Sequence, residues 1–427
     1  MKNKWKKLLA AVLAGGLLAA CGQGGGEAKP TADKGNDAAE KADGEISVML
    51  PEWGLPSDEM LDQFEKESGV KVNLMPTDWD DIRDKISTAA VGKKAAADVY
   101  EVDWSWVGEF KSAGWLEPLD LDEETVKDIP SLDTFKVEDK YYAVPYSNEY
   151  RMGFYNKKQF DEAGVNDAPK TWEDMIQAGQ SLKDKGVSDY PVAMPMAADE
   201  NTTTFFLATT YAMTGQVFND DNTLNKENAL KTLQVMDKIN QDGLVDPAYR
   251  TTNEGKFDLL TKGEAAMAVA PSFYAIRTDG KDSAVNGEVN VMNLPGEDGP
   301  SDKTVAFVEA VGISPYSENP AGARAFVDWY TSEATQKQLF DVVEILPTRN
   351  SALHNVVENG DIREAEPMLQ LAEQVGSPFP NGVPNYYTEM STAMFNTISE
   401  MANGKLSPEE AAEQMAQKVD ELAKNAD

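Results

Sequence analysis

From residue 45 onward, short apolar runs alternate with stretches whose apolar positions repeat at helical spacing. Strands are predicted at 45–50, 70–74 and 97–103, and helices at 57–68 and 79–91. Ser57 is placed to cap the first helix and Gly69 to end it. Strands that alternate with helices in this order predict a parallel sheet with helices on its faces. The ends of two of these strands carry aromatic and acidic residues, at Trp53 and at Asp103-Trp104-Ser105-Trp106, where open α/β sheets bind ligands.

The same α/β alternation continues to the end of the chain. Further strands are predicted at 144–146, 152–156, 267–270 and 305–314, and helices at 171–185, through most of 199–242, and at 320–329. The chain after 350 is predicted to be helical, with an interruption at the Pro/Asn/Gly-rich stretch 376–385. The segment 219–223 is predicted to be a polar hairpin turn.

The N-terminus has the pattern of a signal peptide over residues 1–20. Four lysines lie among the first seven residues, and residues 8–20 are apolar but too short to span a bilayer. Leu18-Ala19-Ala20-Cys21 resembles the lipobox of bacterial lipoproteins. Cys21 is the only cysteine, so it cannot form an internal disulfide. We therefore expect Cys21 to carry the lipid that holds the protein at the extracytoplasmic face of the cell membrane. The alternative is an ordinary secretory signal with a chance cysteine.

Residues 21–44 are predicted to be a flexible tether, because Gly, Ala, Lys, Asp and Glu leave almost nothing to bury. About 380 residues follow, enough for two lobes with separate cores. The formal net charge is −34, and removal of the four signal-peptide lysines makes it −38 (−34 − 4). Such an acidic chain argues against nucleic acid as a partner and favours a monomer.

Several kinds of enzyme site have no counterpart in the sequence. It contains no phosphate-binding loop with Gly-Lys-Ser/Thr, and no Gly-x-Ser-x-Gly. His354 is the only histidine and is expected at the surface, which leaves no histidine cluster for a metal. We expect no enzymatic activity, cofactor or metal.

Four segments, taken in order, resemble the carbohydrate-binding proteins of ABC importers, the broad family that includes maltose-binding protein. They are Tyr142-Ala143-Val144-Pro145-Tyr146 through Phe154-Tyr155-Asn156-Lys157, then 168–174, 263–269, and 312–349 with Leu346-Pro347-Thr348-Arg349 near its end. The resemblance covers nearly all of residues 45–427.

This resemblance implies a two-lobe periplasmic-binding-protein-like fold with a hinge of three crossings, near 147–151, 300–304 and 346–350. One lobe would comprise 45–147 plus 304–346, and the other 151–300 plus 350–427. In the family the lobes close on a ligand by a hinge motion, and the membrane permease recognises the closed form. The chain would then be the substrate-capture subunit of an importer, with a sugar, preferably an oligosaccharide, as its ligand.

A sugar offers apolar faces for aromatic stacking and hydroxyls for charged hydrogen-bond partners. Asp103 and Trp104 fit this pattern best. Alternation predicts that one indole points outward, and Trp104 is favoured over Trp106. The alternative is that both indoles pack under the next helix.

Other candidates come from the register of the family motifs. Glu149 lies six residues before Tyr155, where the family has a ligand-binding carboxylate; its alternative is a solvated hinge residue. Phe273 takes the place of a stacking tryptophan, although Ala270-Pro271-Ser272-Phe273-Tyr274 departs from the family motif and leaves the register uncertain by one residue. Tyr274 and Arg277 follow Phe273, and Tyr386 and Tyr387 lie in a loop where the family often has a late aromatic. Two further candidates come from position alone: Trp53 follows the first strand, and Glu309 ends an apolar run near a crossing.

Two other functions stay open at this point. Carboxylates and aromatics could enclose a cation such as a polyamine. Paired carboxylates could also serve a secreted glycoside hydrolase, although 73 acidic residues make such pairs common by chance.

Overall fold

The computed structural model describes residues 43–426, except 361 and 364. The predicted signal peptide, Cys21 and nearly all of the tether lie outside these residues. Among the helices that it describes, none combines the length and apolarity needed to cross a membrane.

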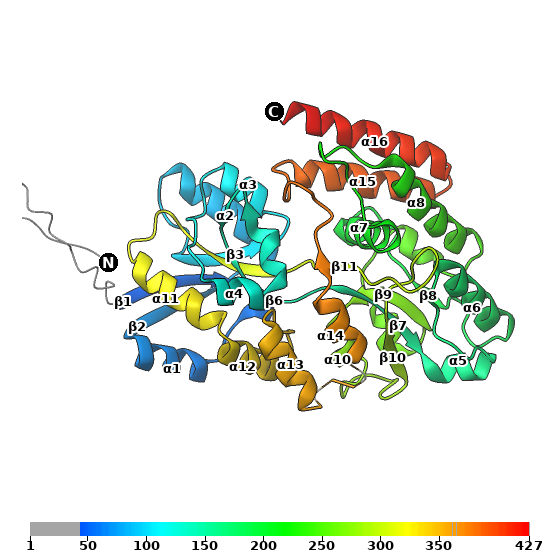
Figure 1. Ribbon diagram of the computed structural model, residues 1–427, viewed down its shortest axis with the longest axis horizontal. Coiled ribbons are helices and arrows are strands. Elements are labelled where there is room, and N and C mark those ends of the chain that lie inside the picture. The colour runs from blue at the N-terminus through cyan, green and yellow to red at the C-terminus, as the bar shows by residue number, and fades with distance from the viewer. Residues whose placement is uncertain (1–42, 361, 364, 427) are drawn as a thin grey trace, which may run out of the picture. The chain divides into compact units, whose positions relative to one another are not determined.

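The first sheet has five strands in the order β2-β1-β3-β12-β6 (Figure 1). Their bounds are β1 Gly44–Leu50, β2 Val70–Pro76, β3 Val99–Asp103, β6 Val144–Ser147 and β12 Glu309–Ile313. β1 pairs in parallel with β2 and β3, as predicted, but β12 is antiparallel to both of its neighbours. The sheet is therefore mixed, because a strand from much later in the chain enters it from the opposite direction.

Helices and a small hairpin accompany this sheet. They are η1 Glu52–Gly54, α1 Asp58–Ser68, α2 Trp79–Val91, α3 Val107–Ser112, α4 Glu123–Asp128, η2 Pro130–Phe135, β4 Lys136–Val137, β5 Lys140–Tyr141, α11 Pro320–Tyr330 and α12 Glu333–Val343. The predicted caps of α1 are confirmed: the Ser57 side chain accepts a hydrogen bond from the amide of Met60, and Gly69 ends the helix at φ +81°. Phe64 of α1 packs edge-on against Phe326 of α11.

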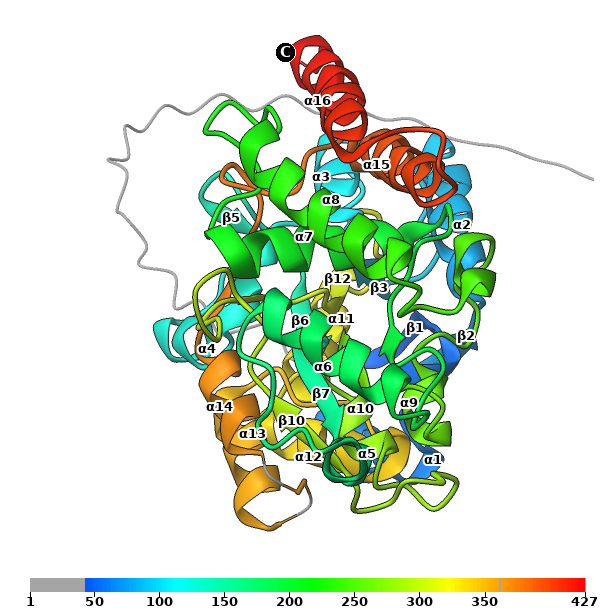
Figure 2. The same cartoon turned by 90° about the vertical axis from the view of Figure 1, so that its right-hand side faces the viewer.

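The second sheet has four strands in the order β10-β7-β9-β8. Their bounds are β7 Arg151–Asn156, β8 Val192–Ala193, β9 Met267–Pro271 and β10 Val289–Met292. The helices that follow these strands are α5 Lys157–Ala163, α6 Trp172–Asp184, α7 Glu200–Thr214, α8 Lys226–Gln241, η3 Pro247–Arg250, α9 Asp258–Lys262, α10 Tyr274–Arg277, α13 Asn350–Glu358, α14 Glu366–Ala372, α15 Tyr387–Ala402 and α16 Pro408–Asn425. Helices α7, α8, α15 and α16 pack against one another (Figures 1 and 2).

The chain passes between the two sheets three times, and hydrogen bonds connect the passing segments. The amide of Asn148 donates to the carbonyl of Leu346 at 2.9 Å, and the amide of Phe307 donates to the carbonyl of Glu149 at 2.7 Å. The predicted strand 305–314 is wrong in part. It is divided into β11 (Thr304–Val305), which pairs with β13 (Val375–Gly376), and β12, because the residues between them form a passing segment.

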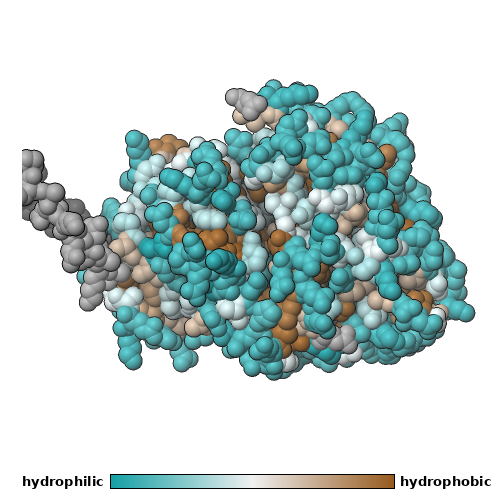
Figure 3. All heavy atoms as spheres, viewed as in Figure 1, coloured by the Kyte–Doolittle hydropathy of each residue, from teal (hydrophilic) through white to brown (hydrophobic). Residues whose placement is uncertain are grey.

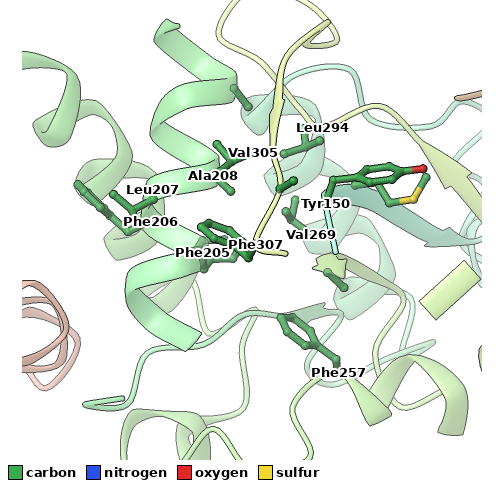
Figure 4. Close-up of a cluster of buried hydrophobic side chains, with 14 of the residues drawn as sticks. Tyr150, Phe205, Phe206, Leu207, Ala208, Phe257, Val269, Leu294, Val305 and Phe307 are labelled. Atoms are coloured by element: carbon green, nitrogen blue, oxygen red, sulfur yellow. The ribbon is translucent and has the colours of Figure 1, made fainter. Parts of the chain in front are cut away.

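This passing segment is held by apolar packing. Figure 4 shows Val305 and Phe307 facing Phe205 and Ala208 of α7, and all four side chains are buried. Trp172, Met390 and Met394 are also buried in the core. The predicted hairpin turn at 219–223 is confirmed, because an antiparallel bridge between Phe218 and Leu224 closes it. Figure 3 shows mostly hydrophilic residues over one face, in keeping with the acidic composition.

Candidate ligand-binding site

Three carboxyl groups lie on one face of the first sheet near the ends of β3 and β12. Side chains two residues apart share a face of a strand, which places Glu101 and Asp103 together. Glu309 begins β12 and is the register partner of Asp103, so it joins the same face. On the other side of β12 the register shifts between Glu309 and Ala310, and the extra residue on β6 is Tyr146. Such a bulge redirects a side chain, and here the Tyr146 hydroxyl reaches the carboxyl groups.

Trp53 and Glu309 are joined directly. The Trp53 indole N–H donates to Glu309 Oε2, and the Tyr146 hydroxyl lies 3.1 Å from the same oxygen. The Tyr146 hydroxyl also lies 2.8 Å from Glu101 Oε2. Trp53 is 42% exposed, one of the few large apolar side chains at the surface. The arrangement combines an accessible indole face with a carboxyl group fixed beside it.

The surroundings of these carboxyl groups favour their neutral form. Burial, followed by the charge of Asp103, raises the pKa of Glu309 to about 8. Burial is also the main reason why the pKa of Glu101 lies well above its usual value, and the charge of Glu309 adds to it. Burial raises the pKa of Asp103 to about 6, although two hydrogen bonds from Ser105 oppose the rise.

Glu149 forms an ion pair with Arg151 on the segment that leaves the first sheet. The Arg151 side chain is almost wholly buried, also donates to Thr204 Oγ1 at 3.1 Å, and lies 4.9 Å above the Phe307 ring. Glu149 is partly exposed and lies close enough to Asp103 and Glu309 for its charge to raise their pKa values.

Trp104 belongs to an aromatic cluster rather than to the surface. Its ring lies 4.8 Å from those of Phe307 and Tyr387 and 6.3 Å from that of Phe379. Both indoles of the Trp104-Ser105-Trp106 turn are buried, so the predicted outward orientation is wrong. Trp106 packs against Trp79 of α2 and Phe110 of α3. A role for Trp104 in binding stays a prediction.

A fourth carboxyl group, Glu200, lies beside this aromatic cluster. The Tyr387 hydroxyl and the Ser391 hydroxyl both hydrogen-bond to it. Burial raises the pKa of Glu200 to about 7, and the nearby charge of Asp103 contributes. Tyr386 precedes α15 and is half-buried against the core.

The remaining predicted residues form a second cluster on α10. Phe273 stacks on Tyr274 at 5.1 Å, and the Arg277 guanidinium covers the Phe273 ring at 4.3 Å. The Tyr274 hydroxyl donates to Asp258 at 2.9 Å, and Arg277 and Asp258 line a cavity of roughly 610 Å³. The family register at 271–274 stays a prediction.

A buried lysine, Lys256, lies within electrostatic range of Glu149 and Arg151 and of Asp258. The Lys256 ammonium lies 4.4 Å above the Phe257 ring. Burial, followed by the charge of Arg151, lowers the pKa of Lys256 to about 8, and Asp199 and Glu149 act in the opposite direction. Within the part of the chain that the structure describes, no three His, Cys, Asp or Glu side chains gather as a metal site would require.

Three charged residues of this region were not predicted: Glu101, Glu200 and Lys256. Glu101 interrupts an otherwise apolar strand, Val99-Tyr100-Glu101-Val102. Glu200 is the only charged residue of α7. Burial of a carboxylate is costly. A single carboxylate in an otherwise uncharged, buried segment could therefore have indicated both Glu101 and Glu200. Lys256 lies in a polar loop and has no such signal.

Comparisons with known proteins agree with this architecture. Residues 50–337 match the family described as bacterial extracellular solute-binding protein. The galactooligosaccharide-binding protein of Bacillus subtilis is 23% identical over 94% of this chain and 92% of its own length. The fold is similar to that of maltose-bound MalE3 of T. maritima, with TM-score 0.75, 18% identity, and coverage of 89% of this chain and 100% of that one. It is also similar to the sugar-binding protein MalE of Xanthomonas citri, with TM-score 0.76, 20% identity, and coverage of 89% and 98%.

The chain therefore belongs to the bacterial extracellular solute-binding proteins. Its fold is the two-lobe α/β fold of the maltose-binding-protein-like structures.

Proposed function

We propose that this protein is the substrate-capture subunit of an ABC importer and that it binds a sugar, preferably an oligosaccharide, for delivery to a membrane permease. The observation that carries the proposal is the pairing of Trp53 with Glu309. The exposed indole supplies a stacking face, and the carboxyl group beside it supplies a directional hydrogen-bond partner. The ligands for which the similar proteins are named, galactooligosaccharide and maltose, support the same class of ligand.

The proposed site extends from Trp53 to the α10 cluster. Asp103, Trp104, Glu149 and Glu309 would form one part of the site, and Tyr386 and Tyr387 would lie beside them. Phe273, Tyr274 and Arg277 would extend it towards the cavity of roughly 610 Å³ that Arg277 lines. A site with several separate aromatic groups suits several sugar rings better than one.

Capture would occur by hinge closure. The lobes would be 45–147 plus 304–346, and 151–300 plus 350–427, and the three passing segments would serve as the hinge. The hydrogen bonds between Asn148 and Leu346 and between Phe307 and Glu149 support this role, because they connect passing segments that are far apart in sequence.

We also propose that the mature protein is a monomer anchored by a lipid on Cys21, at the outer face of the cell membrane. The support is the sequence Leu18-Ala19-Ala20-Cys21. Labelled palmitate incorporated by the wild-type chain and lost in Cys21→Ser would agree with the anchor. Equal labelling of both would contradict it.

A thermal-shift screen tests the ligand class, because a ligand that binds only the native state raises the melting temperature. The full chain with Cys21→Ser would be screened against maltotriose, galactotriose, chitobiose and spermidine. We expect at least one oligosaccharide to raise the melting temperature. A shift with spermidine and with none of the sugars would refute the proposal in favour of a polyamine.

Binding without hydrolysis completes the proposal. Incubation of the protein with the same oligosaccharides should release no reducing sugar. Sustained release that Glu309→Gln abolishes would instead indicate a glycoside hydrolase.

A further inference from the structure

The hydroxyl group of Tyr146 lies between two carboxyl groups. Its oxygen is 2.8 Å from Glu101 Oε2 and 3.1 Å from Glu309 Oε2, and both separations are those of hydrogen bonds. A tyrosine hydroxyl has one hydrogen to donate. If it donates to one carboxylate, the other contact is a hydrogen bond only when that carboxyl group carries a proton and donates to the tyrosine oxygen. Two separate hydrogen bonds therefore require at least one proton on the pair.

The position of the hydroxyl is fixed by its neighbours. A Cβ atom on Gly54 would lie 2.6 Å from Tyr146 Oη, so the hydroxyl has no room to retreat on that side. The Tyr330 hydroxyl, which lies nearby, donates to the carbonyl of Gly54 and not to the carboxyl pair. Tyr146 is also fully buried, and its ring packs 5.1 Å from that of Tyr330.

Glu101 is fully buried, and its second oxygen, Oε1, has no hydrogen-bond partner in the structure. An ionised carboxylate in this position would lack compensation for its lost hydration. The titratable groups that act on the pair are also unfavourable to charge. Asp103 comes from β3 and Glu149 from the passing segment, and the pair in turn raises the pKa of Tyr330 on α11. The nearby cation Arg151 is engaged with Glu149 and Thr204.

We propose that Glu101 and Tyr146 are positioning residues that keep one proton on the Glu101–Glu309 pair, so that the pair meets a bound sugar with at most one negative charge and capture of a neutral sugar takes up protons. This inference rests on the proposed function. The bound sugar displaces water from Glu309, which further disfavours the ionised form. The fraction of pairs that is fully ionised in the free protein then gains a proton from the solvent.

The proton content of the free protein can be measured without any ligand. Carboxyl ¹³C NMR of glutamate-labelled protein, titrated from pH 5 to 9, should show one carboxyl group of the pair still protonated at pH 7. In Glu101→Gln only one carboxyl group of the pair remains to titrate, and the pKa of Glu309 should fall. Tyr146→Phe is a second and smaller change, and it should also shift the pKa of Glu309. Two ionised carboxylates at pH 7 in the wild-type chain would overturn the proposal.

Calorimetry then measures the coupling to binding. Maltotriose and galactotriose would be titrated at pH 8 in phosphate and in Tris, whose ionisation enthalpies differ. We expect the difference between the two enthalpies to report uptake of a fraction of a proton, up to about one per ligand, and this uptake should fall in Glu101→Gln. Asp98→Asn is the control, because it removes a partly buried carboxyl group away from the pair. The proton uptake on sugar binding should be unchanged in this variant.

The two proposals fail in different ways. If no oligosaccharide of the thermal-shift screen binds, the proposed ligand class is wrong, and the NMR titration still decides whether the pair holds a proton. If a sugar binds with equal enthalpy in both buffers, or with proton release, the ligand class stands and the inference is wrong.

Discussion

Gly54 and Tyr146 approach each other so closely that a Cβ atom at position 54 would lie 2.6 Å from the tyrosine hydroxyl oxygen and 3.1 Å from the ring carbon that bears it. The glycine is required here by the close contact and not by a left-handed backbone. Residue 54 directly follows Trp53, and Tyr146 contacts Glu309, so one close approach aligns both partners of the Trp53–Glu309 hydrogen bond.

Gly54→Ala should therefore displace Tyr146 and, with it, the Trp53–Glu309 pair. Because Tyr146 is fully buried and cannot move freely, the added methyl group should lower the free energy of unfolding by about 1–3 kcal/mol. It should also weaken sugar binding. Urea denaturation and calorimetry would measure the two effects. Gly299→Ala is the matched control, since a Cβ atom there would meet nothing within 4 Å. Equal stability of the two variants would contradict the account.

The buried carboxyl groups should make the protein less stable as pH rises. The pKa values of Asp103, Glu200 and Glu309 are raised to about 6, 7 and 8. Between about pH 4.5 and 8 the folded state thus binds more protons than the unfolded state, so the free energy of unfolding falls with pH. Each proton of difference contributes about 1.4 kcal/mol per pH unit. The lowered pKa of Lys256, about 8, acts in the opposite sense, but mainly above this range.

Urea denaturation at pH 5, 6, 7 and 8 would measure this slope. Glu309→Gln replaces the carboxyl group with a neutral group of similar shape, so its stability should depend less on pH, most visibly near pH 8. A wild-type protein that grows more stable from pH 5 to 8 would show that these carboxyl groups are ionised without penalty.

The ion pair between Glu149 and Arg151 should matter more than an ion pair at the surface. Glu149→Gln leaves the Arg151 guanidinium, whose side chain is 4% exposed, without a full counter-charge. We expect the free energy of unfolding to fall by about 1–3 kcal/mol. Glu138→Gln is the control, because Glu138 pairs with Lys111 at the surface and its loss should have little effect. The prediction fails if denaturation shows equal losses for the two variants.

The sequence predicts much of the fold because local signals agree with the tertiary structure. The helix predicted at 79–91 is observed at Trp79–Val91, and the capping residues of α1 are as expected. The order of strands within a sheet is not a local property. β12 lies more than 150 residues after β6 in the chain, yet it inserts between β3 and β6 and is antiparallel to both. No pattern within β12 indicates this position.

The same distinction holds for the site. Asp103 and Trp104 were predicted because they stand at a strand end, and Glu309 because it ends an apolar run near a predicted crossing. The orientation of Trp104 was predicted wrongly, since Phe307, Phe379 and Tyr387 from distant segments enclose it. The contact between Glu101 and Tyr146 depends on the bulge at Glu309 and Ala310, which only the paired strands define.

The most direct test of the binding site is calorimetry of Trp53→Ala with the oligosaccharide that gives the largest thermal shift. Trp53 is 42% exposed, so its removal should change stability little. We expect sugar binding to weaken by about 1–3 kcal/mol, from the loss of a stacking aromatic. Tyr190→Ala removes another exposed aromatic, 37% exposed and outside the proposed site, and should bind as the wild type does. Unchanged affinity in Trp53→Ala would contradict the proposed site.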